Sequence, residues 1–502
     1  MIFIKVSMSH LFLFFAFLTF HDTEAQSIKD HPEIYDAYHD VLKLKIESGR
    51  AKLNQVIPNH AQLGHYHYVK SLADVVEILI SEDPKLFKKY EDSEEDNLDG
   101  LREMEESDPH YRYYNAEIRI QWAIVKIMFE EDMKAGMSLK TAYNYIEKNI
   151  EKHPDFVANY KAYGSLHVLF AVVPESYHWI LKFFGIKGNS ILGWDELNKI
   201  QPDSPYWLET GLIKALIAIN ILNKEKQTLT LLDELKKSHK DNLIVNYLYN
   251  TALVKYAKSE QALPNLRKLL FTSAEYHHID NVYYKLGDIY MQKQQYPLAR
   301  YHLSKFLNQY QGTNYIKDTW FKIFLSYWLE GNEKMAEIHW NKAKDSGRTF
   351  ASADRNANSI LEEDNYPNPL LMKARLATDG GYFGLANQAL KNIQQGSLAD
   401  KKDESEYFYR YGRLDDKTGK DQDAIFNYLN AIKKAGKENW YFAPSACLYT
   451  GYIYESRKDY KKAEFYYEKA MSYKKHPYKA GIDHKAHAAL ELIQDKLPKK
   501  KK

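Results

Sequence analysis

The chain has 502 residues, of which 45% are apolar, and its 69 basic and 67 acidic side chains give a formal net charge of +2. A charge this close to neutral excludes the strongly basic composition typical of nucleic-acid-binding proteins, so no nucleic acid is expected as a partner. Cys447 is the single cysteine, which excludes an intramolecular disulfide.

Residues 1–25 have the features of an export signal. Lys5 supplies a positive charge, residues 11–20 are apolar, and Thr23-Glu24-Ala25 resembles a cleavage motif. An uncleaved membrane anchor is the alternative, although such an anchor needs about 20 apolar residues. Because an exported protein without disulfides fits a bacterial compartment, we expect the periplasm or outer envelope of a Gram-negative bacterium, with possible peripheral association with the envelope.

The sequence after the signal is predicted to be helical in two regions. Residues 26–107 form N-terminal helices followed by an acidic linker, since residues 91–106 are rich in charge and lack a periodic apolar face. Residues 108–272 follow a helix–turn–helix rhythm without a residue-level signature and are interpreted as degenerate repeats. Two of their helices are expected at residues 116–133 and 138–152. The second should stop at His153-Pro154, because a residue before proline disfavours the helical conformation.

Five units in residues 273–495 share one spacing. In each unit, a small residue or a phenylalanine lies near the middle of one predicted helix. An alanine follows it 12 positions later, on the next predicted helix, as Ala299 follows Gly287. The other pairs are Phe324 and Ala336, Ala374 and Ala386, Gly412 and Ala424, and Gly451 and Ala463. Small residues at these positions allow two helices to cross closely, and the pattern resembles the tetratricopeptide repeat. The resemblance implies an all-α, right-handed superhelical solenoid of helix pairs.

Two shorter segments are similar to a narrower family. Residues 173–197 and the closing helix at residues 478–490 resemble the inclusion-body-clearance and tetratricopeptide repeat 39-type proteins. The predicted export signal makes this chain an exported bacterial relative of that architecture. Residues 345–368 form an insertion between two units, where solenoids often place functional loops. Residues 496–502 are a basic tail, interpreted as solvated.

Catalytic motifs are lacking in this sequence, which favours a non-enzymatic protein without a metal or cofactor. No His-Glu-x-x-His, phosphate-binding glycine loop, Gly-x-Ser-x-Gly or Cys-x-x-Cys is present. His65 and His67 are two residues apart, a spacing that suits a metal only on a strand or loop. We therefore interpret both as ordinary histidines.

The inner surface of the solenoid is the predicted binding groove. In the repeat family, positions flanking the small residue of the first helix face inward, which here selects Tyr284, Asp288, Phe321, Trp328, Arg375, Glu406, Tyr409, Arg413, Tyr452 and Glu455. Arg375 and Arg413 occupy equivalent positions, so both could bind one carboxylate. Alternatively, Glu406 and Asp416 pair with Arg413 on a solvated surface.

These observations favour an exported scaffold that binds a partner protein or peptide in its concave groove. The alternative is an envelope protein that binds a glycan or small ligand, with Trp328, Tyr409 and Tyr452 as stacking platforms. Both hypotheses predict that the groove, and no catalytic centre, performs the function.

Overall fold

The computed structural model describes residues 27–497 except residues 61, 172–187, 223–224, 395–397 and 399. The predicted export signal, most of the segment at 173–197 and the end of the basic tail lie outside the described residues. Within the described part, every regular element is a helix. The all-α prediction is therefore confirmed.

The N-terminal half contains helices of very different lengths. They are η1 (Ile28–Asp30), α1 (Pro32–Leu42), α2 (Ile46–Leu53), α3 (Leu63–Ser81), α4 (Pro84–Lys89), α5 (Ser93–Gly100), η2 (Leu101–Glu103), α6 (Pro109–Met128), α7 (Asp132–Lys152), α8 (Asn159–Ala171), α10 (Ser190–Leu197), α11 (Trp207–Ile217), the π-helical turn η4 (Ala218–Leu222), α12 (Glu225–Ser238), α13 (Leu243–Lys255) and α14 (Ser259–Leu269).

The C-terminal half contains the regular pairs. They are α15 (Asn281–Gln292) with α16 (Tyr296–Gln309), α17 (Ile316–Glu330) with α18 (Glu333–Asp345), α20 (Pro369–Gly380) with α21 (Phe383–Lys391), α22 (Lys401–Lys417) with α23 (Asp421–Ala435), and α24 (Phe442–Ser456) with α25 (Tyr460–Ser472). Between and after them lie α19 (Ser352–Glu362), α26 (Lys479–Ile493) and η5 (Gln494–Lys496).

The predicted helix crossings are present in all five pairs. Ala299, Ala336, Ala374, Ala386, Ala424 and Ala463 are completely buried. A Cβ atom on Gly287, Gly412 or Gly451 would lie 2.5, 2.5 or 2.4 Å from a side chain of the partner helix. Since real Cβ atoms do not approach neighbours so closely, these positions need glycine for the helices to pack.

The prediction of an acidic linker at residues 91–106 is wrong, because these residues form α5 and η2. Glu94, Glu95 and Asp96 lie in the first turn of α5, where carboxylates interact favourably with the helix dipole. The buried side chains of this helix are polar: Asn97 donates to the Ser93 carbonyl at 2.7 Å. An apolar periodicity could not reveal a helix that buries serine and asparagine.

One helix boundary and the insertion also differ from the prediction. Residues 116–133 do not form one helix, because α6 ends at Met128 and Glu130 adopts a left-handed conformation with φ 64° before α7. The helix stop at His153 is confirmed. The insertion at residues 345–368 contains a helix, α19, which packs against α17 and α18.

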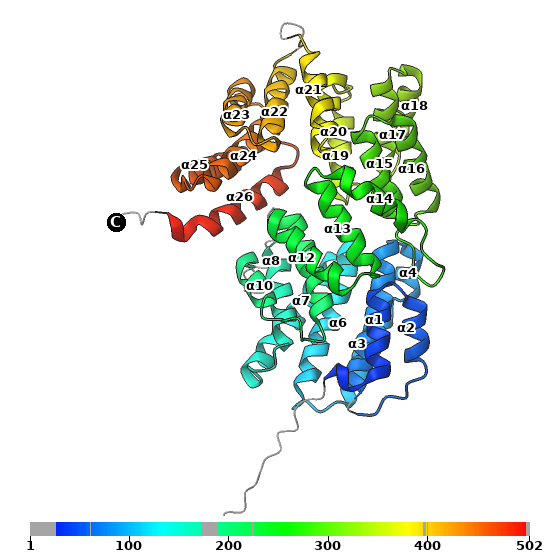
Figure 1. Ribbon diagram of the computed structural model, residues 1–502. Helices are drawn as coiled ribbons and strands as arrows, with labels where there is room; N and C mark the ends of the chain where they lie inside the picture. The colour runs from blue at the N-terminus through cyan, green and yellow to red at the C-terminus, as the bar shows by residue number, and fades with distance from the viewer. Residues whose placement is uncertain are drawn as a thin grey trace, which may run out of the picture.

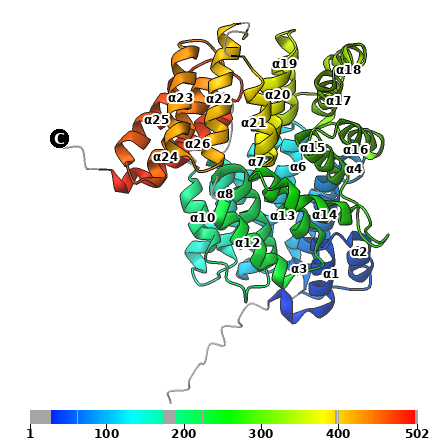
Figure 2. The same cartoon turned by 45° about the horizontal axis from the view of Figure 1, so that its top comes forward.

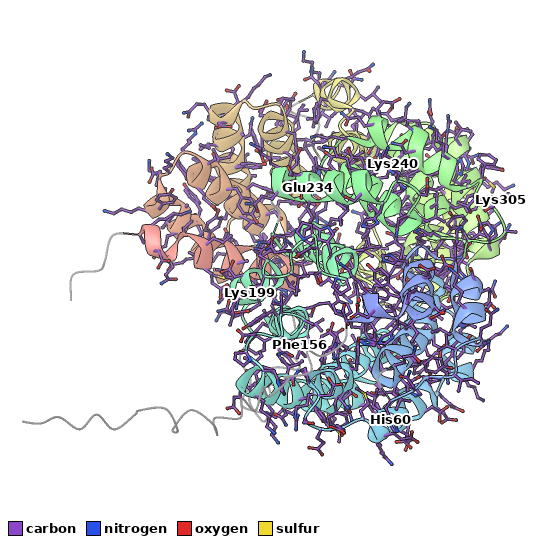
Figure 3. All side chains as sticks on the ribbon, turned by 60° about the horizontal axis from the view of Figure 1, so that its bottom comes forward. His60, Phe156, Lys199, Glu234, Lys240 and Lys305 are labelled. Atoms are coloured by element: carbon purple, nitrogen blue, oxygen red, sulfur yellow. The ribbon has the colours of Figure 1, made fainter. Side chains whose placement is uncertain are left out.

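The helix pairs are arranged side by side around an arc, from α15–α16 to α24–α25 (Figure 2). The closing helix α26 begins near the middle of the molecule and runs along α24–α25 toward the C terminus (Figure 1). It also contacts α10 and η4 of the N-terminal half, and in Figure 3 the end of α10, marked by Lys199, lies beside α26. The superhelix therefore brings the last helix back onto residues about 270–290 positions earlier.

Candidate functional site

A pocket of about 770 Å³, which includes open solvent, lies where α19, α20, α22, α24 and the start of α26 meet. We call it the aromatic groove, and it is lined by Tyr366, Pro367, Asn368, Met372, Arg375, Asp403, Glu406, Trp440, Tyr441, Phe442, Pro477 and Tyr478, among others. Its lining comes from positions more than 100 residues apart. It is a shallow, partly open depression, and its lining mixes aromatic rings with many charged and amide side chains.

Aromatic rings form one wall of the groove. The rings of Tyr441 and Tyr478 meet edge to face with centroids 4.7 Å apart, and Tyr441 contacts Phe442 at 4.4 Å. Tyr478 has a left-handed backbone conformation with φ 67°, directly before α26. This conformation is uncommon for an aromatic residue, and it occurs here at the position that contributes a ring to the groove.

The two arginines at the groove differ in how fully they are engaged. The Arg410 Nε donates to Glu406 Oε1 at 2.9 Å, and another guanidinium nitrogen donates to the Tyr441 hydroxyl at 2.5 Å. The Arg375 guanidinium donates to the Tyr478 hydroxyl at 3.3 Å and lies 3.9 Å from Asp379. A guanidinium carries five N–H donors, so Arg375, whose side chain is 25% exposed, keeps donors for a ligand.

Asp403, on the same helix as Glu406 and Arg410, also lines the groove. Asp403 accepts a hydrogen bond from the Asn368 side chain at 2.9 Å, and burial raises the pKa of Asp403 although this bond lowers it. Asn368 also accepts from the backbone N–H groups of Leu370 and Leu371 and so caps the start of α20. The lining of the groove therefore includes a guanidinium, carboxylates and aromatic rings.

Two of the ten predicted groove residues line this pocket, namely Arg375 and Glu406. Tyr284, Phe321 and Tyr409 are only 3%, 5% and 5% exposed, so they pack in the core and present no open surface. The periodic positions that face inward in a regular repeat are here covered by the neighbouring helices.

The other predicted groove residues contact their own neighbours. Asp288 pairs with Lys322 at 2.5 Å. The Trp328 indole donates to the Pro367 carbonyl at 2.9 Å, beside the groove. Glu455 accepts from the Tyr467 hydroxyl at 2.6 Å, and Tyr452 packs on the same tyrosine ring at 5.6 Å.

The prediction that Arg375 and Arg413 bind one ligand together is not supported, because only Arg375 lines the groove. The Arg413 guanidinium lies 3.9 Å from the Tyr449 ring centroid and 3.5 Å from Asp416. Sequence reasoning missed Arg410, which reaches the groove through Tyr441. The i, i+4 spacing of Glu406 and Arg410 on one helix was the available signal.

Solved structures of helical-repeat proteins resemble this chain at low sequence identity. Human IFIT1, solved as a dimer with PPP-AAAA, is 15% identical and aligns over 89% of this chain and 95% of its own, with a TM-score of 0.32. The APC/C hetero-tetramer Cut9–Hcn1 is 14% identical and aligns over 91% of this chain and 93% of its own, with a TM-score of 0.29. Yeast Tom70 is 13% identical and aligns over 84% of this chain and 97% of its own, with a TM-score of 0.20. Within the described residues, the chain consists of helices that pack in successive pairs. No protein-family model and no curated protein matches its sequence.

The two histidines with a metal-like spacing, His65 and His67, lie on α3. The His65 ring contacts the Tyr114 hydroxyl at 2.5 Å, and His67 contacts the Asn97 side chain at 3.1 Å. In the described ranges, no three His, Cys, Asp or Glu side chains are grouped as a metal site requires. Among the helices of those ranges, none is both long and apolar enough to cross a bilayer.

Proposed function

We propose that this tetratricopeptide protein is an exported, non-enzymatic scaffold that binds the C-terminal segment of a partner protein in the aromatic groove. The observation that carries the proposal is the position of Arg375, an arginine with unused donors beside a wall of tyrosine rings. A guanidinium suits the two oxygens of a terminal carboxylate, and the rings suit an apolar side chain next to it. Asp403 and Asn368, which also line the groove, offer polar groups to the peptide backbone.

A photo-reactive amino acid in place of Trp440 tests the proposal, because this half-buried side chain lines the groove and has no hydrogen bond to lose. We expect it to crosslink one discrete protein in the native envelope fraction. The crosslink should be lost with Arg375→Ala and retained with Arg413→Ala, the matched control whose guanidinium is held by Tyr449 and Asp416. A crosslink that survives Arg375→Ala contradicts the proposal.

The same partner then tests the carboxylate. A synthetic peptide with the partner's last residues should bind at least about tenfold more tightly as the free acid than as the C-terminal amide, a difference of about 1.4 kcal/mol. Equal binding of the two peptides would show that Arg375 does not bind a terminal carboxylate.

Export is the second part of the proposal and needs its own measurement. We expect the protein in the envelope fraction of a Gram-negative host to begin at Gln26, because the small-residue motif ends at Ala25. Mass spectrometry of the intact protein gives the N-terminus directly. A chain that retains Met1 in the cytoplasm would contradict export, whereas one that retains Met1 in the membrane fraction would support an anchor.

A glycan is the second candidate ligand, favoured by the rings of Trp440, Tyr441 and Tyr478 on one wall of the groove. Sugars stack on such rings, although Tyr409, one of the predicted platforms, is buried. Binding to a glycan array that Trp440→Ala abolishes, together with no protein crosslink, would replace the peptide by a glycan.

A further inference from the structure

Exposed apolar side chains recur on the outer face of the helix pairs, at one position of the repeat. This position lies two residues after the buried alanine of each second helix, about 200° around the helix axis and so on the opposite side. It is occupied by Tyr301 on α16, Ile338 on α18, Phe426 on α23 and Phe465 on α25, which are 55%, 42%, 66% and 55% exposed. In the pair α20–α21 the same position is the polar Gln388. Because these apolar side chains recur in phase and are not scattered singly, they indicate an interaction surface.

Lysines flank the phenylalanine of α25. Lys461 lies one turn before Phe465 and Lys469 one turn after it, on the same face of the helix. The Lys469 ammonium is 5.9 Å from the centroid of the Phe465 ring. Lys496, in the last turn η5, lies with its ammonium 5.5 Å from the ring centroid of Tyr460, the residue directly before Lys461. The end of the closing helix therefore brings a further positive charge to the start of α25.

The helix α23 of the preceding pair presents a similar face. Phe426 and Leu429 are exposed on one side of it, and the exposed Lys433 follows one turn after Leu429. Helices α23 and α25 lie beside each other at one edge of the molecule in both ribbon views (Figure 1, Figure 2). Since Phe426 and Phe465 occupy equivalent positions in successive pairs, the two faces continue one another. We call this surface the outer basic face: Phe426, Leu429, Lys433, Lys461, Phe465 and Lys469.

This end of the molecule carries a strong positive charge. Residues 457–502 contain 14 lysine and arginine side chains against six aspartate and glutamate side chains, a formal charge of +8 in a chain whose total is +2. Four of these lysines form the tail at residues 499–502. Within the described part of the chain, no ion pair joins Lys433, Lys461 or Lys469 to a carboxylate. The outer basic face therefore suits an anionic partner.

Protruding rings among lysines fit the surface of an anionic lipid bilayer. The ring enters the boundary between headgroups and acyl chains, while the long lysine side chains carry their ammonium groups to the lipid phosphates. The negative potential of anionic lipids attracts each lysine of such a cluster. A partner helix is bound in an apolar groove instead, whereas Phe426 and Phe465 project with more than half of their surface exposed.

We propose that the outer basic face binds peripherally to anionic membrane lipids, with Phe426 and Phe465 in the interfacial layer and the lysines at the lipid phosphates. The aromatic groove is lined by α19, α20, α22 and the starts of α24 and α26, so the two surfaces belong to different helices. This inference goes beyond the proposed peptide binding. It places the scaffold at a membrane surface while its groove stays open to a partner.

Sedimentation of the full mature chain with lipid vesicles tests the proposal. The chain should bind vesicles of equal parts phosphatidylcholine and phosphatidylglycerol, and not vesicles of phosphatidylcholine alone. Phe465→Ala should weaken this binding at least about tenfold, because a benzyl group no longer leaves water. Tyr301→Ala is the matched control: it removes a ring at the equivalent position of α16, in the first of the five pairs, and should leave binding unchanged. No binding of the wild type to the anionic vesicles, or an equal loss in the two variants, would overturn the proposal.

The part played by the lysines is measured through salt. Lys461→Glu combined with Lys469→Glu should weaken vesicle binding at least about tenfold and reduce its dependence on salt concentration, because salt screens the charges. Phe465→Ala should weaken binding without changing that dependence. Glu468→Lys, which replaces an exposed carboxylate on the same helix, should strengthen binding. If the double lysine variant and Glu468→Lys both bind as the wild type does, the lysines do not contact lipid and the proposal fails.

Two further measurements separate the outer basic face from the aromatic groove and from a protein partner. Arg375→Ala should lose the peptide partner and still bind anionic vesicles as the wild type does; loss of vesicle binding in this variant would contradict two separate surfaces. A photo-reactive amino acid in place of Phe426 should crosslink to lipid. A discrete protein crosslinked there, in a chain that does not bind vesicles, would assign the face to a protein and refute the lipid proposal.

Discussion

Single glycines set how closely the paired helices approach. The missing Cβ of Gly412 on α22 leaves room for the Tyr428 ring of α23, whose Cδ1 atom would lie 2.5 Å from an added Cβ. Tyr428 is completely buried, so it has no free space to move into. We expect Gly412→Ala to lower the free energy of unfolding by about 1–3 kcal/mol through overpacking, measured by urea denaturation.

Gly384→Ala is the control for that substitution. Gly384 lies in the first turn of α21, and an added Cβ would meet nothing within 4 Å. Alanine is a better helix former than glycine, so this change should be neutral or stabilise by up to about 1 kcal/mol. If both variants lose the same stability, the tight crossing at Gly412 is not the cause.

A buried histidine makes the C-terminal half sensitive to acid. His302 on α16 stacks on Tyr290 with centroids 5.2 Å apart, and its residue is 8% exposed. Burial, followed by the charge of Arg267, lowers the pKa of His302 to about 4 from the usual 6.5. Between pH 4 and pH 6.5, His302 is therefore protonated in the unfolded chain but neutral in the folded chain. The stability contributed by neutral His302 is complete above pH 6.5 and is lost as the pH falls toward 4.

The variant His302→Phe should remove part of that pH dependence. The free energy of unfolding of the variant minus that of the wild type is expected to be about 1–2 kcal/mol larger at pH 5 than at pH 7.5. Urea denaturation at the two pH values measures this difference, so any loss of packing that is common to both values cancels. An unchanged difference between wild type and variant would show that His302 does not titrate as its burial implies.

At the scale of elements, α19 acts as a cap for α17. Asp354 of α19 accepts hydrogen bonds from the backbone N–H groups of Tyr315 at 2.6 Å and Asp318 at 2.9 Å. These are first-turn donors of α17, which lack partners within their own helix. Tyr315, with φ 64°, has no capping side chain of its own. The insertion that lengthens one repeat therefore completes the start of the preceding pair.

The substitution Asp354→Ala should destabilise the protein by about 1–2 kcal/mol, as the loss of a helix cap does. Hydrogen exchange should quicken first at the amides of Tyr315 and Asp318. Asp364→Ala serves as the comparison, because its ion pair with Lys344 is 74% exposed on the aspartate side and contributes little. Equal exchange at Tyr315 in the two variants would remove α19 from this capping role.

The five helix pairs could be predicted from the sequence because each crossing involves two residues only 12 positions apart, both of them small in every pair except that of Phe324 with Ala336. Helix α5 could not, since its buried side chains are polar and no apolar period marks it. Helix α19 was missed although Ala357 and Leu361 share one buried face, because it lies outside the 12-residue spacing of the pairs. The aromatic groove combines Arg375 with Tyr478, more than 100 residues later, and the periodic rule also selected buried side chains such as Tyr409. Only the packed superhelix shows which inward positions remain open.

At the scale of the whole molecule, a buried ion network joins five helices of the N-terminal half. The Lys161 ammonium on α8 is completely buried and lies 2.8 Å from Glu117 of α6, 2.7 Å from Glu209 of α11 and 2.9 Å from the Tyr68 hydroxyl of α3. Tyr38 of α1 donates to the same Glu209 at 2.9 Å. Burial raises the pKa of Glu117 to about 7, although Lys161 lowers it. One lysine thus balances two carboxylates in the core.

Removal of that single cation should unfold the N-terminal half first. Lys161→Met leaves Glu117 and Glu209 buried without a positive partner, which costs about 3–5 kcal/mol, a large part of the stability of an ordinary domain. Because the C-terminal pairs have their own buried clusters, hydrogen exchange should accelerate in α1, α3, α6 and α8 before α22–α25. Simultaneous acceleration in both halves would mean that the solenoid unfolds as one unit.

Because Glu117 and Glu209 are carboxylates, the stability lost in Lys161→Met should depend on pH, and neutralising one of them should restore part of it. Without Lys161, the folded-state pKa of Glu117 must rise further above 4.5, so the folded chain binds more protons than the unfolded chain. The deficit of Lys161→Met should therefore shrink as the pH falls from 8 to 5. Adding Glu209→Gln should recover part of the loss at pH 8, because one uncompensated charge disappears. If the deficit is independent of pH and the second substitution recovers nothing, the volume of the lysine side chain, and not its charge, holds these helices together.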